Sequence, residues 1–134
     1  MNVYALDSNI ISFYLRENST VIENIEKAIS DGNGIVIPPI VYYEVKRGLK
    51  IINATRKIKE FEVLCGLFPV RESGDYLLEE SINIYVHERK SGRNTEDADI
   101  FISAFCIYNN YTLVTDNIDH FSKIADLNVI NWAR

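Results

Sequence analysis

The sequence predicts a three-layer α/β/α sandwich, in one domain over residues 1–134, with a mostly parallel sheet of short strands. Two patterns support this prediction. Short apolar runs that suit buried strands alternate with stretches of helical periodicity, and no hairpin turn signal joins two strand-like runs. Parallel strands need long crossover connections, usually helices, so we expect helices on both faces of the sheet.

The first half of the chain predicts two strands and three helices. A strand is expected at about 3–6 and a short helix at about 9–16. The stretch "STVIENIEKAISDG" predicts a helix that Ser19 or Thr20 caps, with glycine just beyond its end. "GIVIPP" predicts a short strand, and Pro38-Pro39 suits the start of the next helix, "IVYYEVKRGLKII". We expect that helix to bend or break near Gly48 or near Asn53-Ala54.

The second half continues the alternation. A helix at about 55–65 leads into "GLFPV", which predicts a third strand. "GDYLLEESINIYVHERKSG" predicts a long amphipathic helix, and "TEDADIFISAFCIYNN" another, capped by Thr95. "TLVT" and "NVINW" predict the last strands, separated by a short helix at about 119–125.

The composition indicates a soluble globular protein. The 134 residues are 47% hydrophobic and 25% charged, and no apolar stretch approaches the ~18 residues that a membrane span needs. No signal peptide is recognisable at the N-terminus, so we expect a cytoplasmic protein with no membrane partner. Cys65 and Cys106 lie in apolar contexts without metal-binding spacing, which predicts reduced core residues and no zinc site.

The net charge of −5 argues at first against a nucleic-acid partner, but the basic residues are clustered. Between residues 46 and 59 there are six basic residues and no acidic one, and a smaller basic cluster precedes "TEDAD". These stretches fit either contacts with a polyanion or a solvated helix face.

Two aspartates stand at strand ends. Asp7 follows the first strand directly, and Asp116 follows the strand-like "TLVT". In a parallel sheet, the carboxyl ends of neighbouring strands meet at the edge where ligands bind. If these two strands are neighbours, the two carboxylates would repel each other there unless a cation lay between them.

Two further acidic residues are candidates for the same edge. Glu44 lies one turn into the helix after the second strand, and Asp99 lies in the first turn of the helix at 95–110, with Asp97 just before it. Each has a simpler interpretation. Asp97 and Asp99 would also complement a helix dipole, Glu44 could pair with Arg47 at the surface, and Asp116 could form a turn.

Several carboxylates without His or Cys ligands select a hard cation, Mg²⁺ or Mn²⁺. Such a site is suited to metal-assisted phosphodiester hydrolysis, in which basic residues would hold the rest of the polyanion. The candidates for that contact are Lys46, Arg47, Lys50 and Arg93. Neither His87 nor His120 is paired with a nucleophile, and the absence of a Gly-rich phosphate loop disfavours nucleoside-triphosphate chemistry.

The whole chain resembles the PIN-domain family and, within it, the VapC-type toxins of toxin–antitoxin pairs. The resemblance rests on "LDSNIIS", "PPIVYYEVKRGL", "TEDADIFISA", "TLVTDNIDHF" and "LNVINW", in this order. It implies a small α/β/α sandwich and an Mg²⁺-dependent endoribonuclease, often specific for tRNA or rRNA. By position, Asp7, Glu44 and Asp99 match the family's acidic residues, with Asp7 and Asp99 as metal ligands. Ser8 takes the place of the Thr or Ser that commonly follows the first aspartate.

The chain departs from the family at the fourth acid. Many relatives have an aspartate where this chain has Asn117, so Asp116 is predicted to fill that role, with Asn117 and Asp119 as alternatives. The resemblance also implies a VapB-type antitoxin as partner, and a homodimer whose joined basic surfaces would bind RNA.

Two other functions stay open at this point. A receiver-like or phosphotransfer domain also places acids at parallel strand ends, but it would need paired acids where "LDSN" supplies one. The other alternative is a binding module with a PIN-like fold that has lost its catalytic activity.

Overall fold

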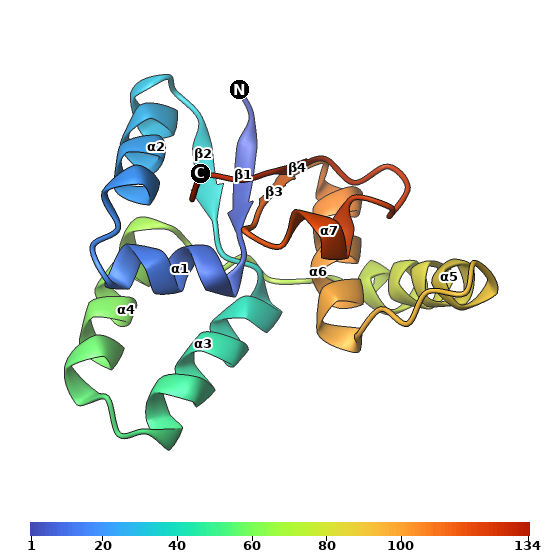
Figure 1. Cartoon of the computed structure of the whole chain (residues 1–134), viewed down its shortest axis with the longest axis horizontal. Helices are drawn as coiled ribbons and strands as arrows, with labels where there is room; N and C mark the ends of the chain where they lie inside the picture. The colour runs from blue at the N-terminus through green and yellow to red at the C-terminus, as the bar shows by residue number, and fades with distance from the viewer.

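Four short parallel strands form the centre of the computed structural model, which describes residues 1–134 (Figure 1). The strands are β1 (Val3–Leu6), β2 (Gly34–Val36), β3 (Thr112–Val114) and β4 (Val129–Ile130). Their order in the sheet is β2-β1-β3-β4, and every neighbouring pair is parallel. Ala5 in β1 lies opposite Val36 of β2 and Leu113 of β3, so the N-terminal strand is central.

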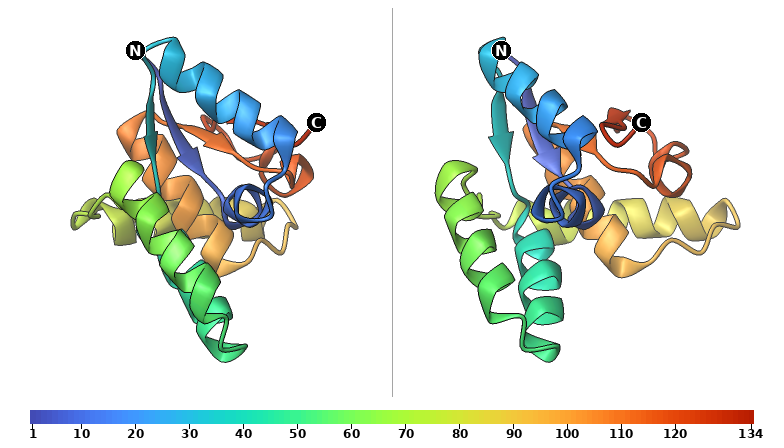
Figure 2. Two further views of the ribbon diagram at one scale, coloured as in Figure 1. Left: turned by 90° about the vertical axis from the view of Figure 1, so that its left-hand side faces the viewer. Right: turned by 60° about the vertical axis from the view of Figure 1, so that its left-hand side comes forward.

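Seven helices surround this sheet. They are α1 (Ser8–Leu15), α2 (Ser19–Ser30), α3 (Pro39–Ile51), α4 (Thr55–Leu67), α5 (Tyr76–Lys90), α6 (Asp97–Asn109) and α7 (Ile118–Phe121). Figure 2 shows α2 along one face of the strands and α6 along the other. The predicted three-layer sandwich with a parallel sheet is therefore confirmed. Helices α3 and α4 pack side by side below the sheet in Figure 1, and α5 lies to one side against α6.

The core joins the sheet to helices from both layers. Ala5 and Leu6 of β1 are fully buried, because a central strand of a covered sheet is shielded on both faces. Ile10 from α1, Phe61 from α4 and Phe105 from α6 belong to the same buried cluster. The cluster holds α1, α4 and α6 against the sheet and so fixes the positions of the loops at its carboxyl edge.

Two predicted helix caps are wrong. The residue that caps α2 is Asn18, whose side-chain oxygen accepts a hydrogen bond from Val21 N at 3.1 Å, and the helix begins at Ser19. Thr95 does not cap α6, which begins at Asp97. Its hydroxyl donates instead to a carboxylate oxygen of Glu88 at 2.7 Å, a longer-range partner that a local capping pattern does not reveal.

The predicted strand at 66–70 is also wrong. Helix α4 continues to Leu67, and only Val70 forms an isolated bridge, to Ile37. Phe61, Leu64 and Phe68 are all buried and have helical spacing, so packing of this face against the core extends the helix until Pro69. The short helix expected at 119–125 is confined to α7, residues 118–121.

The remaining local expectations are largely met. The break after α3 comes at Asn53, whose φ is +53°, and Gly48 lies inside the helix. Pro39 opens α3, as the sequence indicates. Cys106 is buried and Cys65 is half-buried, and neither forms a disulfide. None of the helices has the length and apolar character that crossing a bilayer would require.

Candidate functional site

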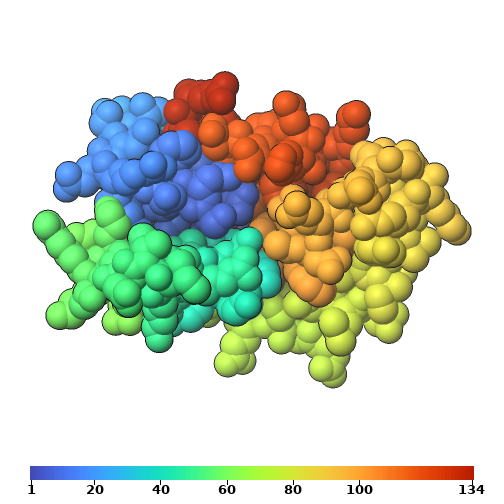
Figure 3. Space-filling model, turned by 60° about the horizontal axis from the view of Figure 1, so that its bottom comes forward, coloured from blue at the N-terminus to red at the C-terminus, as the bar shows by residue number.

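The carboxyl edge of β1 and β3 gathers the predicted acidic residues. Leu6 of β1 and Val114 of β3 are paired neighbours, so Asp7 and Thr115 leave the sheet side by side, and Asp7 N donates to Val114 O at 2.9 Å. Helix α3, which starts beyond β2, brings Glu44, and the first turn of α6 brings Asp99. Figure 3 shows α1 in blue, the start of α3 in teal and α6 in orange meeting on one face of the molecule.

Asp7 is the most deeply buried of these acids, with 5% of its surface exposed. One carboxylate oxygen accepts from Ser8 N at 2.7 Å, and the other accepts from Thr115 Oγ1 at 2.8 Å and from Asn9 Nδ2 at 3.3 Å. Burial raises the pKa of Asp7 above its usual value, and these hydrogen bonds oppose the rise. The carboxylate is therefore fixed in direction at a site that disfavours its charge.

Glu44 and Asp99 are close enough to Asp7 for their charges to interact. Burial raises the pKa of Glu44, and Asp7 raises it further, while Arg47 lowers it. Burial and then Asp7 also raise the pKa of Asp99, which His120 lowers from 3.5 Å away. One oxygen of Glu44, Oε1, is buried without a hydrogen-bond partner. Three carboxylates thus share excess negative charge that the protein's own cations do not neutralise.

Asp116 lies at the same edge, but its side chain makes different contacts. Its Oδ1 accepts from Asn131 Nδ2 at 3.0 Å and faces Arg134 Nε at 3.3 Å, beyond the end of β4. Its backbone N–H donates to Asn9 Oδ1 at 3.0 Å. Asp116 is therefore paired with a cation of its own, and its assignment as the fourth acid stays a prediction.

The other predicted site residues are divided among separate surfaces. Ser8 and Asn117 line a cleft of about 500 Å³ together with Glu44. Asp119 lines a second cleft, of about 340 Å³, together with Asp99 and His120. Asp97 is exposed in a hollow against α5 and is not brought to Asp7.

Sequence reasoning missed the residues that hold this arrangement in place. Asn9 and Thr115 join the loops after β1 and β3, because Asn9 Nδ2 also donates to Thr115 Oγ1 at 3.2 Å. Glu88, 1% exposed on α5, binds Arg93 Nη2 at 2.6 Å and the Thr95 hydroxyl, which fixes the loop before α6. Thr115 adjoins Asp116 in the sequence and Asn9 lies two residues after Asp7, whereas nothing in the α5 pattern distinguishes Glu88 from its charged neighbours.

The four basic residues predicted to contact RNA differ in how free they are. Lys46 is held by the Tyr42 hydroxyl at 2.8 Å and by Glu62 at 3.3 Å. Arg47 lies over the Tyr43 ring, and Arg93 is bound by both carboxylate oxygens of Glu88. Arg47 and Lys50 are exposed and form no ion pair, so these two of the four keep an available charge.

The acidic residues fit a hard divalent cation in two respects. Glu44 has a buried oxygen without a partner, and burial raises the pKa values of Asp7, Glu44 and Asp99, so a bound cation would offset a charge that the site disfavours. No group of three or more His, Cys, Asp or Glu side chains is arranged closely enough to surround a metal ion. Mg²⁺ does not need such a cage, because one or two carboxylates with waters and substrate phosphates suffice to hold it.

Comparison with known proteins gives consistent matches along nearly the whole chain. The PIN domain family model matches residues 4–127. Ribonuclease VapC2 of Rickettsia felis is 26% identical over 136 residues, covering 97% of this chain and 98% of the relative. Ribonuclease VapC1 of Haemophilus influenzae (strain R2866) is 23% identical, covering 98% and 99%. The solved structure of VapBC2 from Rickettsia felis, bound to a DNA fragment from their promoter, superposes with a TM-score of 0.90 at 22% identity, covering 97% of this chain and 98% of the solved one.

Proposed function

We propose that this chain, which belongs to the PIN-domain family, is an Mg²⁺-dependent endoribonuclease and the toxin of a type II toxin–antitoxin pair. The observation that carries the proposal is the group of three carboxylates at the carboxyl edge of a parallel sheet, in which burial and then Asp7 raise the pKa values of Glu44 and Asp99. The relatives named ribonucleases extend over the same length of chain, which supports the activity class.

In this proposal Asp7 and Asp99 hold the cation, and Glu44 acts beside it. Bound Mg²⁺ would supply positive charge to the scissile phosphate and acidity to a bound water; Mn²⁺ could substitute for it. Asp7 is suited to a fixed role, because Ser8, Asn9 and Thr115 bind its oxygens. Glu44 Oε1 has no partner and a raised pKa, so it can accept a proton from the attacking water.

The proposed substrate class is structured RNA, tRNA or rRNA, and the proposed partner is a VapB-type antitoxin. Solved structures similar to this fold include VapBC complexes, which supports an antitoxin partner. A homodimer is a further expectation from the family. Exposed apolar side chains on α5, Leu78 and Ile82, offer a surface for such contacts.

The test is cleavage of RNA by the purified, partner-free protein. Total tRNA and rRNA are incubated with the wild-type protein with Mg²⁺, with EDTA, and with Mg²⁺ and the Asp7→Asn variant. We expect discrete fragments only from the wild-type protein with Mg²⁺, because both the cation and its fixed ligand are required. Asp75→Asn is the matched control, since Asp75 is an exposed aspartate without a side-chain cap bond, and it should cleave like the wild type.

Three results would contradict the proposal. Cleavage that persists in EDTA or in the Asp7→Asn variant would show that these carboxylates are not the site. Intact RNA in every reaction, with Mg²⁺ binding established by calorimetry, would favour the alternative of a non-catalytic binding module. Labelling of the protein by acetyl phosphate would instead favour phosphotransfer.

A further inference from the structure

Two basic residues outside the predicted RNA contacts line the same cleft as Glu44. Arg16 ends α1, and Lys57 lies in the first turn of α4. Both line the cleft of about 500 Å³ that also contains Ser8, Asn9, Glu44 and Asn117. A polyanion that entered this cleft would meet acidic and amide groups from the strand edge and cations from α1 and α4.

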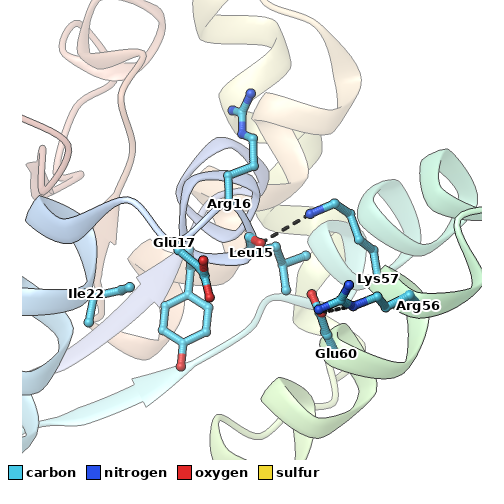
Figure 4. Close-up of a pocket in the computed structure, with 8 residues that line it drawn as sticks. Leu15, Arg16, Glu17, Ile22, Arg56, Lys57 and Glu60 are labelled. Carbon is cyan, nitrogen blue, oxygen red and sulfur yellow. Dashed lines mark hydrogen bonds and ion pairs between the residues drawn. The ribbon is translucent and has the colours of Figure 1, made fainter.

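The same two residues also line an adjoining hollow. This second space, of about 590 Å³, lies between the end of α1, the start of α2 and the start of α4 (Figure 4). Leu15, Arg16 and Lys57 belong to both linings, so the two spaces lie next to each other at these residues. The two cations therefore border both the cleft that contains Glu44 and the hollow beside it.

The charges of Arg16 and Lys57 are not used inside the protein. Neither residue forms an ion pair, whereas Arg56 beside them binds Glu60 at 3.2 Å, and Lys46 and Arg93 are bound to Glu62 and Glu88. Among the basic residues around the acidic edge, these two combine a place in the cleft with a free charge. Phosphate oxygens are the natural partners of such groups.

The local structure holds both side chains in place without neutralising them. Lys57 Nζ donates to the Leu15 carbonyl oxygen at 3.2 Å, one of the carbonyls that the C-terminus of α1 leaves free. The negative end of the helix dipole stabilises an ammonium there. The Arg16 guanidinium lies 5.2 Å from the centre of the Phe13 ring, a contact that orients it and leaves its N–H groups available. Figure 4 shows Lys57 reaching from α4 to Leu15 beside Arg16.

We propose that Arg16 and Lys57 bind a backbone phosphate of the RNA strand next to the phosphate that is cleaved at the acidic edge. This inference rests on the proposed ribonuclease function and adds to it the direction in which the strand leaves the site, along α1 toward the start of α4. Binding would be electrostatic and independent of base identity, because it uses phosphate contacts alone.

The test measures RNA binding separately from cleavage. Asp7→Asn is the background, so that RNA stays intact, and a fluorescein-labelled single-stranded RNA of mixed sequence is the probe in anisotropy titrations at several salt concentrations. Arg16→Gln and Lys57→Gln, singly and together, remove the charges and keep a polar, uncharged side chain. Loss of one bound phosphate reduces the salt slope of binding by about 0.7, so the double variant should lose about 0.7 and each single variant a part of it. Lys57→Arg keeps the positive charge, so it should keep the salt slope of the Asp7→Asn parent protein.

The matched control is Lys59→Gln, because Lys59 is an exposed lysine of the same helix that lines neither space. Circular dichroism verifies that each variant is folded. A double variant with the affinity and slope of the Lys59→Gln control would overturn the inference, even if the wild-type protein cleaves RNA. A wild-type protein that cleaves no RNA in the cleavage experiment would refute the proposed function instead, so the two failures are distinguishable.

Discussion

Thr115→Val is the substitution that best tests how Asp7 is held. Thr115 is fully buried, and its hydroxyl donates to Asp7 Oδ2 at 2.8 Å. The hydroxyl oxygen also accepts from Asn9 Nδ2 at 3.2 Å and from Asn117 N at 3.0 Å. Valine has nearly the same shape, so the substitution removes these three hydrogen bonds and leaves the packing unchanged.

The expected loss of unfolding free energy is about 3 kcal/mol. A hydrogen bond to a charged group contributes roughly 2 kcal/mol and a neutral one roughly 1 kcal/mol. The hydrogen bonds with Asp7 and Asn9 together account for this loss of free energy. The bond from Asn117 N adds little, because Asn117 is exposed and its amide can bind water instead. With an unfolding entropy of about 0.28 kcal/mol/K for a chain of this length, Tm should fall by about 10 °C.

The loss should also depend on pH. Burial already raises the pKa of Asp7, and the Thr115 hydrogen bond lowers it, so in the variant the pKa of Asp7 rises further. A carboxyl whose folded pKa exceeds the unfolded value of about 3.9 destabilises the protein increasingly as pH rises through that range. The difference between variant and wild type is therefore expected to be largest at neutral pH and smallest near pH 4.

Chemical denaturation in urea at several pH values measures the loss of unfolding free energy and its dependence on pH. RNA cleavage by the variant should also fall, because the Asp7 carboxylate is less well fixed. Thr112→Val is the matched control, since Thr112 begins the strand that Thr115 follows and its hydroxyl makes no hydrogen bond. It should change stability by less than about 0.5 kcal/mol. If Thr115→Val costs no more than Thr112→Val, or its cost is independent of pH, the Thr115 hydroxyl does not stabilise the Asp7 carboxylate and the reasoning is refuted.

Three further predictions concern the cation and two buried groups. Mg²⁺ at a hundred times its Kd should stabilise the wild-type protein by about 2.7 kcal/mol in thermal unfolding, and equal stabilisation of Asp99→Asn would exclude Asp99 as a ligand. Arg93→Met should cost about 3 kcal/mol in urea, because it leaves the Glu88 carboxylate buried and unpaired. Arg93 holds the pKa of Glu88 below its usual value, so the difference in unfolding free energy between the wild type and Arg93→Met should narrow as pH falls below about 4. A difference that does not change with pH would argue against the ion pair. Burial raises the pKa of Cys106, so a thiol reagent should modify it only on unfolding, and modification of the native protein as fast as at Cys65 would contradict its burial.

The sequence predicted the fold well where a pattern is local. Short apolar runs between stretches of helical periodicity located all four strands, and for the central strand β1 this follows because a strand covered on both faces is continuously apolar. It failed where a distant partner decides the outcome. Thr95 has the composition of a cap, but Glu88 on another helix binds it. Residues 66–70 are predicted as a strand, but α4 continues to Leu67, because its buried residues Phe61 and Leu64 pack it against the core.

The candidate site follows the same division. Asp7, Glu44 and Asp99 could be predicted because each follows from the position of its strand or helix in a parallel sheet. The separate environment of Asp116 depends on Asn131 and Arg134, which lie beyond β4 and have no recognisable motif. The cleft that joins Arg16 and Lys57 to Glu44 depends on how α1 and α4 pack, which side-chain spacing alone does not specify.

The central position of β1 has a consequence for how the protein is made. Its first neighbour, β2, follows soon after in the chain, but its second neighbour, β3, is synthesised near the end. The hydrogen bond from Thr115 to Asp7 joins residues 108 positions apart. During translation β1 therefore has one unpaired edge until β3 has been synthesised. Contacts between residues so far apart in the sequence also make folding slow. Nascent chains that have not reached β3 should lack the assembled acidic edge, so only chains that extend past β3 would have the proposed activity.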